Sequence, residues 1–113
     1  MNKLTTTEFV ARVCECPDMW VYQARYYSVA ALFDGYDECC GHLDLYPGFH
    51  DWLTAKLGRE SCPMSWPWMV LAIFLGHGPK GGEELPQELE GDAIKKLGEL
   101  LLEYLSEKNG SNA

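Results

Sequence analysis

The most hydrophobic stretch of the chain is an unbroken run of ten residues without a charged side chain, WPWMVLAIFL at positions 66–75. A helix formed by this run is apolar on every side, so we expect the other elements to surround it. Ser65 or Trp66 is placed to cap it, Pro67 falls in its first turn, and Gly76 follows as a stop. The sequence therefore predicts a central core helix over 66–75.

Four further helices are predicted from apolar residues that recur at helical spacing, over 6–16, 28–40, 47–57 and from Asp92 onward. Thr5 and Glu8 have the spacing of a capping box, and Gly41 and Gly58 follow the next two helices as stops. Residues 17–27 lack a helical period and predict either a short extended piece or an irregular packed loop. The inner face of 28–40 is expected to carry Val29, Leu32, Phe33, Tyr36 and Cys40.

These elements predict an all-α fold of about five helices, with a single domain over 1–108 and a frayed tail over 109–113. The glycine- and proline-rich stretch 76–87 is expected to be an exposed loop before the last helix. No apolar run is long enough to cross a bilayer, and the N-terminus lacks the apolar stretch of a signal peptide. We therefore expect a cytoplasmic protein without a membrane partner.

Acidic residues outnumber basic ones by 17 to 9, which gives a net charge of −8. This charge repels nucleic acid and favours basic partners. Five carboxylates and no Lys or Arg lie between positions 34 and 51, a second acidic cluster covers 83–92, and Tyr36, Tyr46, Phe49 and Trp52 lie among the first. Aromatic anchors beside charges are typical of protein interfaces, whereas a solvated face that keeps the protein soluble is the alternative. The predicted partner-binding residues are Asp34, Asp37, Glu38, Asp44, Tyr46, Asp51, Glu83 and Glu84.

The carboxylates Asp34, Asp37 and Glu38 fall on the side of their helix opposite its apolar face. We expect none of them to be needed for the fold, so that replacing all three leaves the protein folded. A homo-oligomer that uses part of the aromatic surface also stays open.

The five cysteines are odd in number, two are adjacent, and no export signal is present, which predicts reduced thiols buried as small apolar groups. The alternative is a small regulatory or metal-binding protein, although the cysteine spacing does not match that of zinc modules. No phosphate-binding loop or nucleophile motif is present, so we predict neither an enzyme nor a cofactor. The residues of the metal alternative are Cys14, Cys16, Cys39, Cys40 and His42.

Five short motifs resemble small bacterial immunity proteins encoded beside polymorphic toxins, including those of contact-dependent inhibition systems. They are FVARV (9–13), CPDMWV (16–21), LFDGYD (32–37), PGFHDWL (47–53) and SWPW (65–68). The resemblance spans about residues 9–75 and excludes the last helix. Members of these groups often have an Arg before the Pro of the second motif, where this chain has Cys16.

The resemblance implies a protein that binds one cognate toxin domain tightly and blocks its active site or its assembly. It carries over no catalytic residue. An acidic inhibitor suits a basic toxin such as a nuclease. An acidic nucleic-acid mimic is the remaining alternative, and it would bind several unrelated basic proteins.

Overall fold

The computed structural model describes residues 4–61, 63–76 and 85–110. In these ranges the chain forms five α-helices and no strand, which confirms the predicted all-α fold. The helices are α1 (Thr6–Glu15), α2 (Tyr26–Cys40), α3 (His50–Lys56), α4 (Trp66–Leu75) and α5 (Gln87–Gly110).

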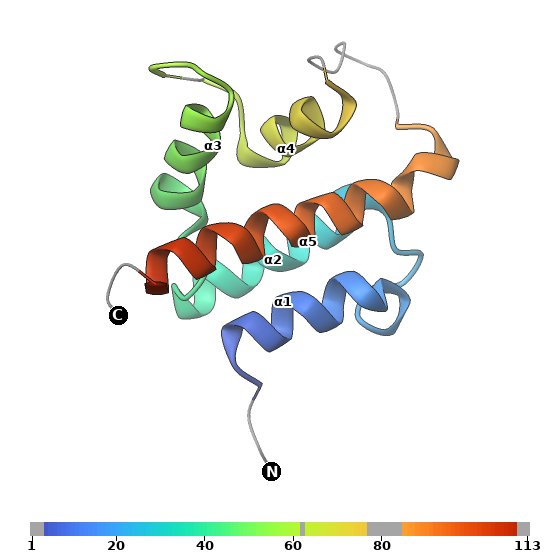
Figure 1. Ribbon diagram of the computed structural model, residues 1–113. Coiled ribbons are helices and arrows are strands. Elements are labelled where there is room, and N and C mark those ends of the chain that lie inside the picture. Colours follow the sequence, from blue (N-terminus) through green and yellow to red (C-terminus); the bar gives the residue numbers. More distant parts are fainter. Residues whose placement is uncertain (1–3, 62, 77–84, 111–113) are drawn as a thin grey trace.

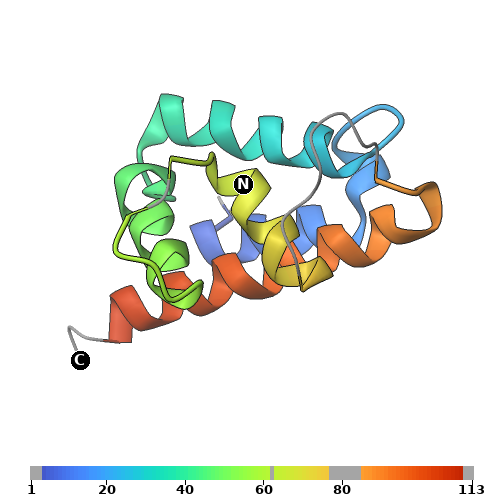
Figure 2. The ribbon, with the colours of Figure 1, turned by 90° about the horizontal axis from the view of Figure 1, so that it is seen from above.

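The long helix α5 occupies the middle of the molecule. In Figure 1 it crosses the centre, with α1 on one side and α3 and α4 on the other, and Figure 2 shows α2 running alongside it. Its apolar stripe contacts α1, α2 and α4. The buried residues of that stripe are Ala93, Ile94, Leu97, Leu100, Leu101, Tyr104 and Leu105.

The apolar run 66–75 forms α4 with the predicted bounds, but the other helices cover it on one side only. Trp66, Met69, Val70, Leu71 and Ala72 are buried against the core, whereas Trp68, Ile73, Phe74 and Leu75 are half-buried. The central position belongs to α5 because that helix is 24 residues long against ten for α4, and so offers an apolar stripe to three neighbours at once.

Local signals set several helix ends as predicted. The Thr5 hydroxyl accepts a hydrogen bond from the Glu8 N–H at 3.1 Å, and the Glu8 carboxylate accepts one from the Thr5 N–H at 3.1 Å, which completes the capping box. Gly41 and Gly76 end α2 and α4 with left-handed φ angles of 70° and 80°, a conformation that glycine adopts without steric cost.

The start of α2 lies two residues before the expected Ser28 cap and depends on contacts from distant parts of the chain. Its N-cap residue Arg25 makes no side-chain capping bond. Instead, Glu90 of α5 accepts a hydrogen bond from the Tyr26 N–H at 2.6 Å, and the Tyr26 hydroxyl donates one to the Pro67 carbonyl at 2.6 Å. These two bonds attach the first turn of α2 to both α5 and α4.

The other differences are local. Residues 45–49 form a wide turn, so α3 begins at His50 and not at Pro47, and α5 begins at Gln87 and not at Asp92. For the chain between α1 and α2, the sequence left open an extended piece or an irregular packed loop. The structure has the irregular loop, with a short 3-10 turn at Pro17–Met19. In this loop Trp20 packs edge-on against Phe9, with ring centroids 5.5 Å apart.

A candidate acidic binding groove

An acidic groove lies where α2 ends and the following loop turns back beside it. The hollow has a volume of about 400 Å³ and is lined by three α2 carboxylates together with residues of the 41–46 loop. The structure thus brings together five of the eight predicted partner-binding residues. They are Asp34, Asp37, Glu38, Asp44 and Tyr46.

Asp37 holds the loop that forms one wall of the groove. Its Oδ1 accepts hydrogen bonds from the N–H groups of Leu43 and Asp44, and its Oδ2 accepts one from Leu45, each at 3.0 Å. Leu43 and Leu45 are buried, so these bonds also fix two core side chains. The expectation that this carboxylate is unnecessary for the fold is wrong, because its acceptors satisfy three successive backbone donors.

Asp34 also has a structural partner. Its Oδ1 accepts a hydrogen bond from the indole Nε1 of Trp66 at 2.9 Å, which links the middle of α2 to the first residue of α4. The carboxylate remains exposed to water, and among the described residues no donor hydrogen-bonds to its other oxygen. Asp34 therefore serves the fold while keeping its charge on the groove.

Asp44 lies at the far wall, in a left-handed conformation with φ of 51°. Its side chain accepts hydrogen bonds from the Tyr104 hydroxyl at 2.8 Å and from the Gly48 N–H at 3.4 Å, and Lys108 approaches at 3.5 Å. Burial acts to raise its pKa, but the Tyr104 hydrogen bond, the Lys108 charge and the Gly48 N–H together hold the pKa of Asp44 below its usual value. The same site raises the pKa of Tyr104, first through burial and then through the Asp44 carboxylate.

Glu38 and Tyr46 are the groove residues with the most freedom to meet a partner. Glu38 is exposed and makes no hydrogen bond or ion pair within the part of the chain that the structure describes. Tyr46 is 75 % exposed, and its ring and the His50 ring lie in an edge-on arrangement with 5.3 Å between centroids. An exposed carboxylate and an exposed aromatic ring thus line the same groove.

The other aromatic residues expected to anchor a partner pack against the hydrophobic core, Phe49 fully and Tyr36 and Trp52 in part. Phe49 is fully buried, Tyr36 stacks on Phe9 at 4.3 Å between centroids, and Trp52 donates its indole N–H to Glu107 at 2.9 Å. The prediction that they form a surface beside the carboxylates is therefore wrong for Phe49, whereas Tyr36 and Trp52 are half-buried and do not line the groove. Helical spacing alone does not separate an aromatic residue that faces the core from one that faces a partner.

Of the remaining predicted residues, Asp51 is exposed on α3, where its Oδ1 lies 3.6 Å from the His50 Nδ1. It does not line the groove. Glu83 and Glu84 fall outside the described residues, as does most of the predicted loop 76–87.

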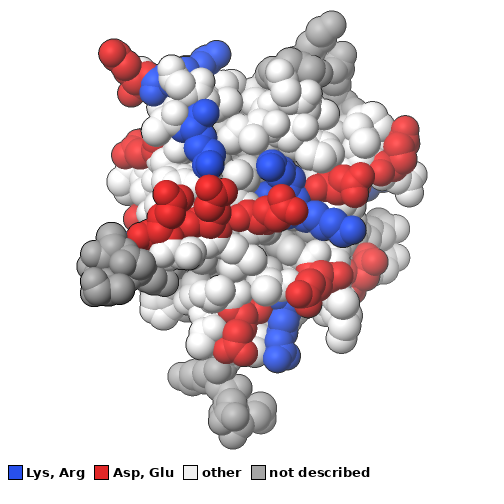
Figure 3. All heavy atoms as spheres, viewed as in Figure 1, with Lys and Arg blue, Asp and Glu red and all other residues white. Residues whose placement is uncertain are grey.

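A second acidic surface, along α5, differs from the groove because lysines accompany its carboxylates. Figure 3 shows acidic side chains in a row across this face, with basic side chains between and beside them. Lys56 reaches Glu103 at 3.0 Å, and Lys96 reaches Glu99 at 3.9 Å. At the groove, by contrast, Lys108 lies at one end, beside Asp44, and among the described residues no salt bridge joins the three α2 carboxylates to a Lys or Arg.

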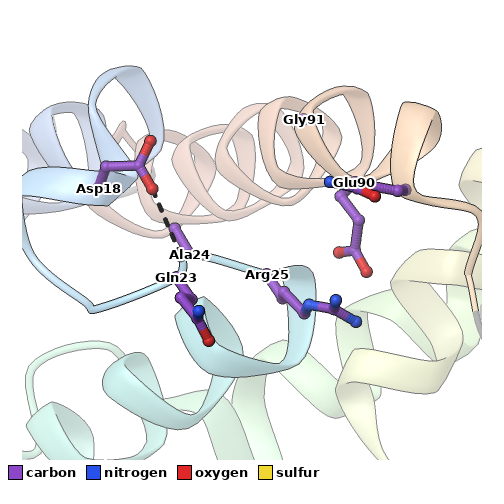
Figure 4. Close-up of a pocket in the computed structure, with 7 residues that line it drawn as sticks. Asp18, Gln23, Ala24, Arg25, Glu90 and Gly91 are labelled. Atoms are coloured by element: carbon purple, nitrogen blue, oxygen red, sulfur yellow. Dashed lines mark hydrogen bonds between the residues drawn. The ribbon is translucent and has the colours of Figure 1, made fainter.

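A further hollow of about 450 Å³ lies at the opposite end of α2, between the 17–25 loop and the first turns of α5. Figure 4 shows Asp18 and Glu90 on opposite sides of it, with Arg25 between them. Both carboxylates serve the backbone, since Asp18 accepts from the Ala24 N–H at 3.4 Å and Glu90 accepts from the Tyr26 N–H. We assign this hollow a structural role.

The loop beside that hollow and the first turn of α2 expose large side chains that the sequence did not single out as partner-binding. Met19 is 83 % exposed, Tyr22 is 89 % exposed and Tyr27 is 53 % exposed. The only signal in the sequence is the absence of a helical period among the apolar residues of 17–27.

The cysteines are less buried than expected. Cys14 is half-buried, but Cys16, Cys39 and Cys40 are exposed, and Cys62 lies outside the described residues. The prediction of buried thiols is wrong for these three, because each lies at the end of a helix: Cys16 is the C-cap residue of α1, and Cys39 and Cys40 are the last two residues of α2. Within the described ranges, no group of three or more His, Cys, Asp or Glu side chains is placed to hold a metal ion.

No family model matches this sequence, and no curated protein or solved structure matches it either. Among the helices that the structure describes, none combines the length and apolar character needed to cross a membrane.

Proposed function

We propose that this protein is an immunity protein that binds a cognate bacterial toxin through the acidic groove and so neutralises it. The observation that carries the proposal is the groove itself, in which four carboxylates from α2 and the next loop lie around one hollow beside an exposed tyrosine. The resemblance of five sequence motifs to immunity proteins supports the same function. In this proposal the protein is a cytoplasmic binding protein and not an enzyme.

The groove suits Lys or Arg side chains of a basic partner. Asp34 and Asp37 are held in place by neutral N–H donors, which orient a carboxylate without cancelling its charge. Carboxylates fixed before the partner arrives lose little conformational entropy on binding. The groove therefore offers preorganised acceptors, and Tyr46 adds an aromatic side chain of the type that dominates binding energy at interfaces.

The first test takes the reading frame immediately upstream of this chain in its genome, where the proposal expects the toxin domain to be encoded. Co-expression of the two should restore growth of cells that the toxin domain alone kills, and the purified pair should form a stable complex. Cells that die although the folded protein accumulates would contradict the proposal. Equally tight binding to several unrelated basic proteins would indicate an acidic nucleic-acid mimic in its place.

A further inference from the structure

The end of α1 and the loop that follows it form another hollow, the α1 hollow, which is more apolar than the acidic groove. It has a volume of about 270 Å³ and is lined by Arg12, Glu15, Cys16, Met19 and Trp20. Met19 is 83 % exposed and Trp20 is 40 % exposed. Large apolar side chains left exposed around a hollow are typical of an interaction surface.

Two opposite charges lie at this hollow. Arg12 and Glu15 are both exposed, and among the described residues neither side chain makes a hydrogen bond or a salt bridge. Glu8, one turn before Arg12, already accepts the Thr5 N–H in the capping box. A partner that matches this surface must therefore supply an apolar side chain together with a carboxylate for Arg12 and a cation for Glu15.

The surface itself meets these requirements. A two-fold axis brings the same patch of two copies together, so that each contact between two different residues occurs twice. Arg12 of each copy can then face Glu15 of the other. Met19, whose side chain is largely exposed, can fill the hollow of the other copy, since methionine adapts to irregular apolar gaps.

We propose that the α1 hollow is the contact surface of a symmetric homodimer, in which Met19 of each copy enters the hollow of the other and Arg12 pairs with Glu15 across the two-fold axis. Because the patch is small, the dimer is weak and depends on protein concentration. None of its residues lines the acidic groove, and in Figure 1 the 17–25 loop and the end of α2 lie at opposite ends of the molecule. The dimer therefore leaves the groove open, and its test does not require the toxin domain.

The test measures sedimentation of the full-length protein from low micromolar to millimolar concentration, under reducing conditions so that no disulfide links two copies. We expect the average molar mass to rise with concentration towards that of two chains. Met19→Asp places a charge in the apolar centre and should raise the dissociation constant about tenfold or more. Tyr46→Asp is the matched control, because it adds the same charge at a largely exposed residue of the groove, and it should dimerise as the parent does.

An exchange of charges tests the symmetric pairing. Arg12→Glu and Glu15→Arg each set like charges against each other twice in the dimer, so each should raise the dissociation constant about tenfold or more. Both substitutions in one chain should restore the parent value. Mixing the two single variants should give a heterodimer, because opposite charges then meet at both contacts. Circular dichroism should show all variants folded, since every substituted side chain is exposed.

The inference is overturned if the parent stays monomeric over the whole concentration range, or if Met19→Asp dimerises as the parent does. Loss of the dimer in Tyr46→Asp would also overturn it, because the contact would then lie at the groove. A mixture of the two single charge variants that remains monomeric would contradict the pairing of Arg12 with Glu15 and overturn the inference as well.

Discussion

Asp37 is the residue on which the shape of the acidic groove depends most. In Asp37→Asn the amide nitrogen replaces one carboxylate oxygen, so at least one of the three backbone N–H groups faces another donor. We expect a loss of about 1–3 kcal/mol in the free energy of unfolding, measured by urea denaturation. Glu38→Gln, the neighbouring exposed carboxylate, should change stability by about 0.5 kcal/mol at most. Equal stability of the two variants would show that Asp37 does not hold the loop.

The lowered pKa of Asp44 predicts how the folding stability of the protein changes at acidic pH. Its pKa is lowered in the folded protein, so the unfolded chain binds more protons as the pH falls below about 4, the usual Asp value. The stability that this group contributes is present above its unfolded pKa and is lost as the pH falls through its folded pKa. Thermal melts should therefore show that the parent loses stability below about pH 4 more steeply than Asp44→Asn does. Parallel pH profiles for the two proteins would contradict this role.

For single residues, the sequence predicted which side chains lie together, but it did not predict their hydrogen-bond partners. Helical spacing placed Asp34, Asp37 and Glu38 together, and all three line the groove. Their bonding partners come from tertiary structure, as when Trp66 reaches Asp34 across 32 residues, and spacing along one helix cannot reveal them.

Among the helices, α1 and α5 cross closely at one point. We therefore expect the same substitution, Gly to Ala, to lower the stability of the protein at one position of α5 and to raise it at another. A Cβ atom at Gly98 would lie 2.9 Å from the Cβ and Sγ atoms of Cys14, whereas one at Gly91 meets nothing within 4 Å. Gly98→Ala should destabilise the protein by about 1 kcal/mol or more, because overpacking costs about 1–3 kcal/mol and exceeds the gain in helix propensity.

Gly91→Ala, in the same helix, should stabilise the protein by about 0.5–1 kcal/mol. Urea denaturation of the two variants beside the parent measures both effects. Stabilisation by both substitutions would mean that α1 and α5 are further apart than in this structure.

Helix ends were predictable where the signal is local. The bounds of α4 follow from Ser65, Pro67 and Gly76, which lie within or beside it. The start of α2 was not predictable, since its first N–H is capped by Glu90, 64 residues away. The central place of α5 was also missed, because hydrophobicity identifies a helix that must be buried but does not say how many neighbours it contacts.

For the whole molecule, carboxylates are paired with lysines to different extents on the two acidic surfaces. This difference supports the groove, and not the α5 face, as the partner-binding surface. The sequence predicted the all-α fold and an acidic protein, but composition could not show that lysines accompany the carboxylates of α5 and leave most of the groove carboxylates without one. The function proposed for the groove stays a prediction.

The most direct test of that function compares two double variants with the same change in charge and in aromatic content. Glu38→Lys with Tyr46→Ala alters the groove rim, whereas Glu99→Lys with Tyr22→Ala alters exposed residues away from it. Both should remain folded, because all four side chains are exposed.

The measurement is the growth of cells that express the cognate toxin domain together with each variant. We predict that the groove variant loses protection, since a reversed charge slows association and a lost aromatic anchor costs about 2 kcal/mol or more in binding, while the control protects as the parent does. Full protection by the folded groove variant, or loss of protection by the control alone, would contradict the assignment of the groove as the toxin-binding site.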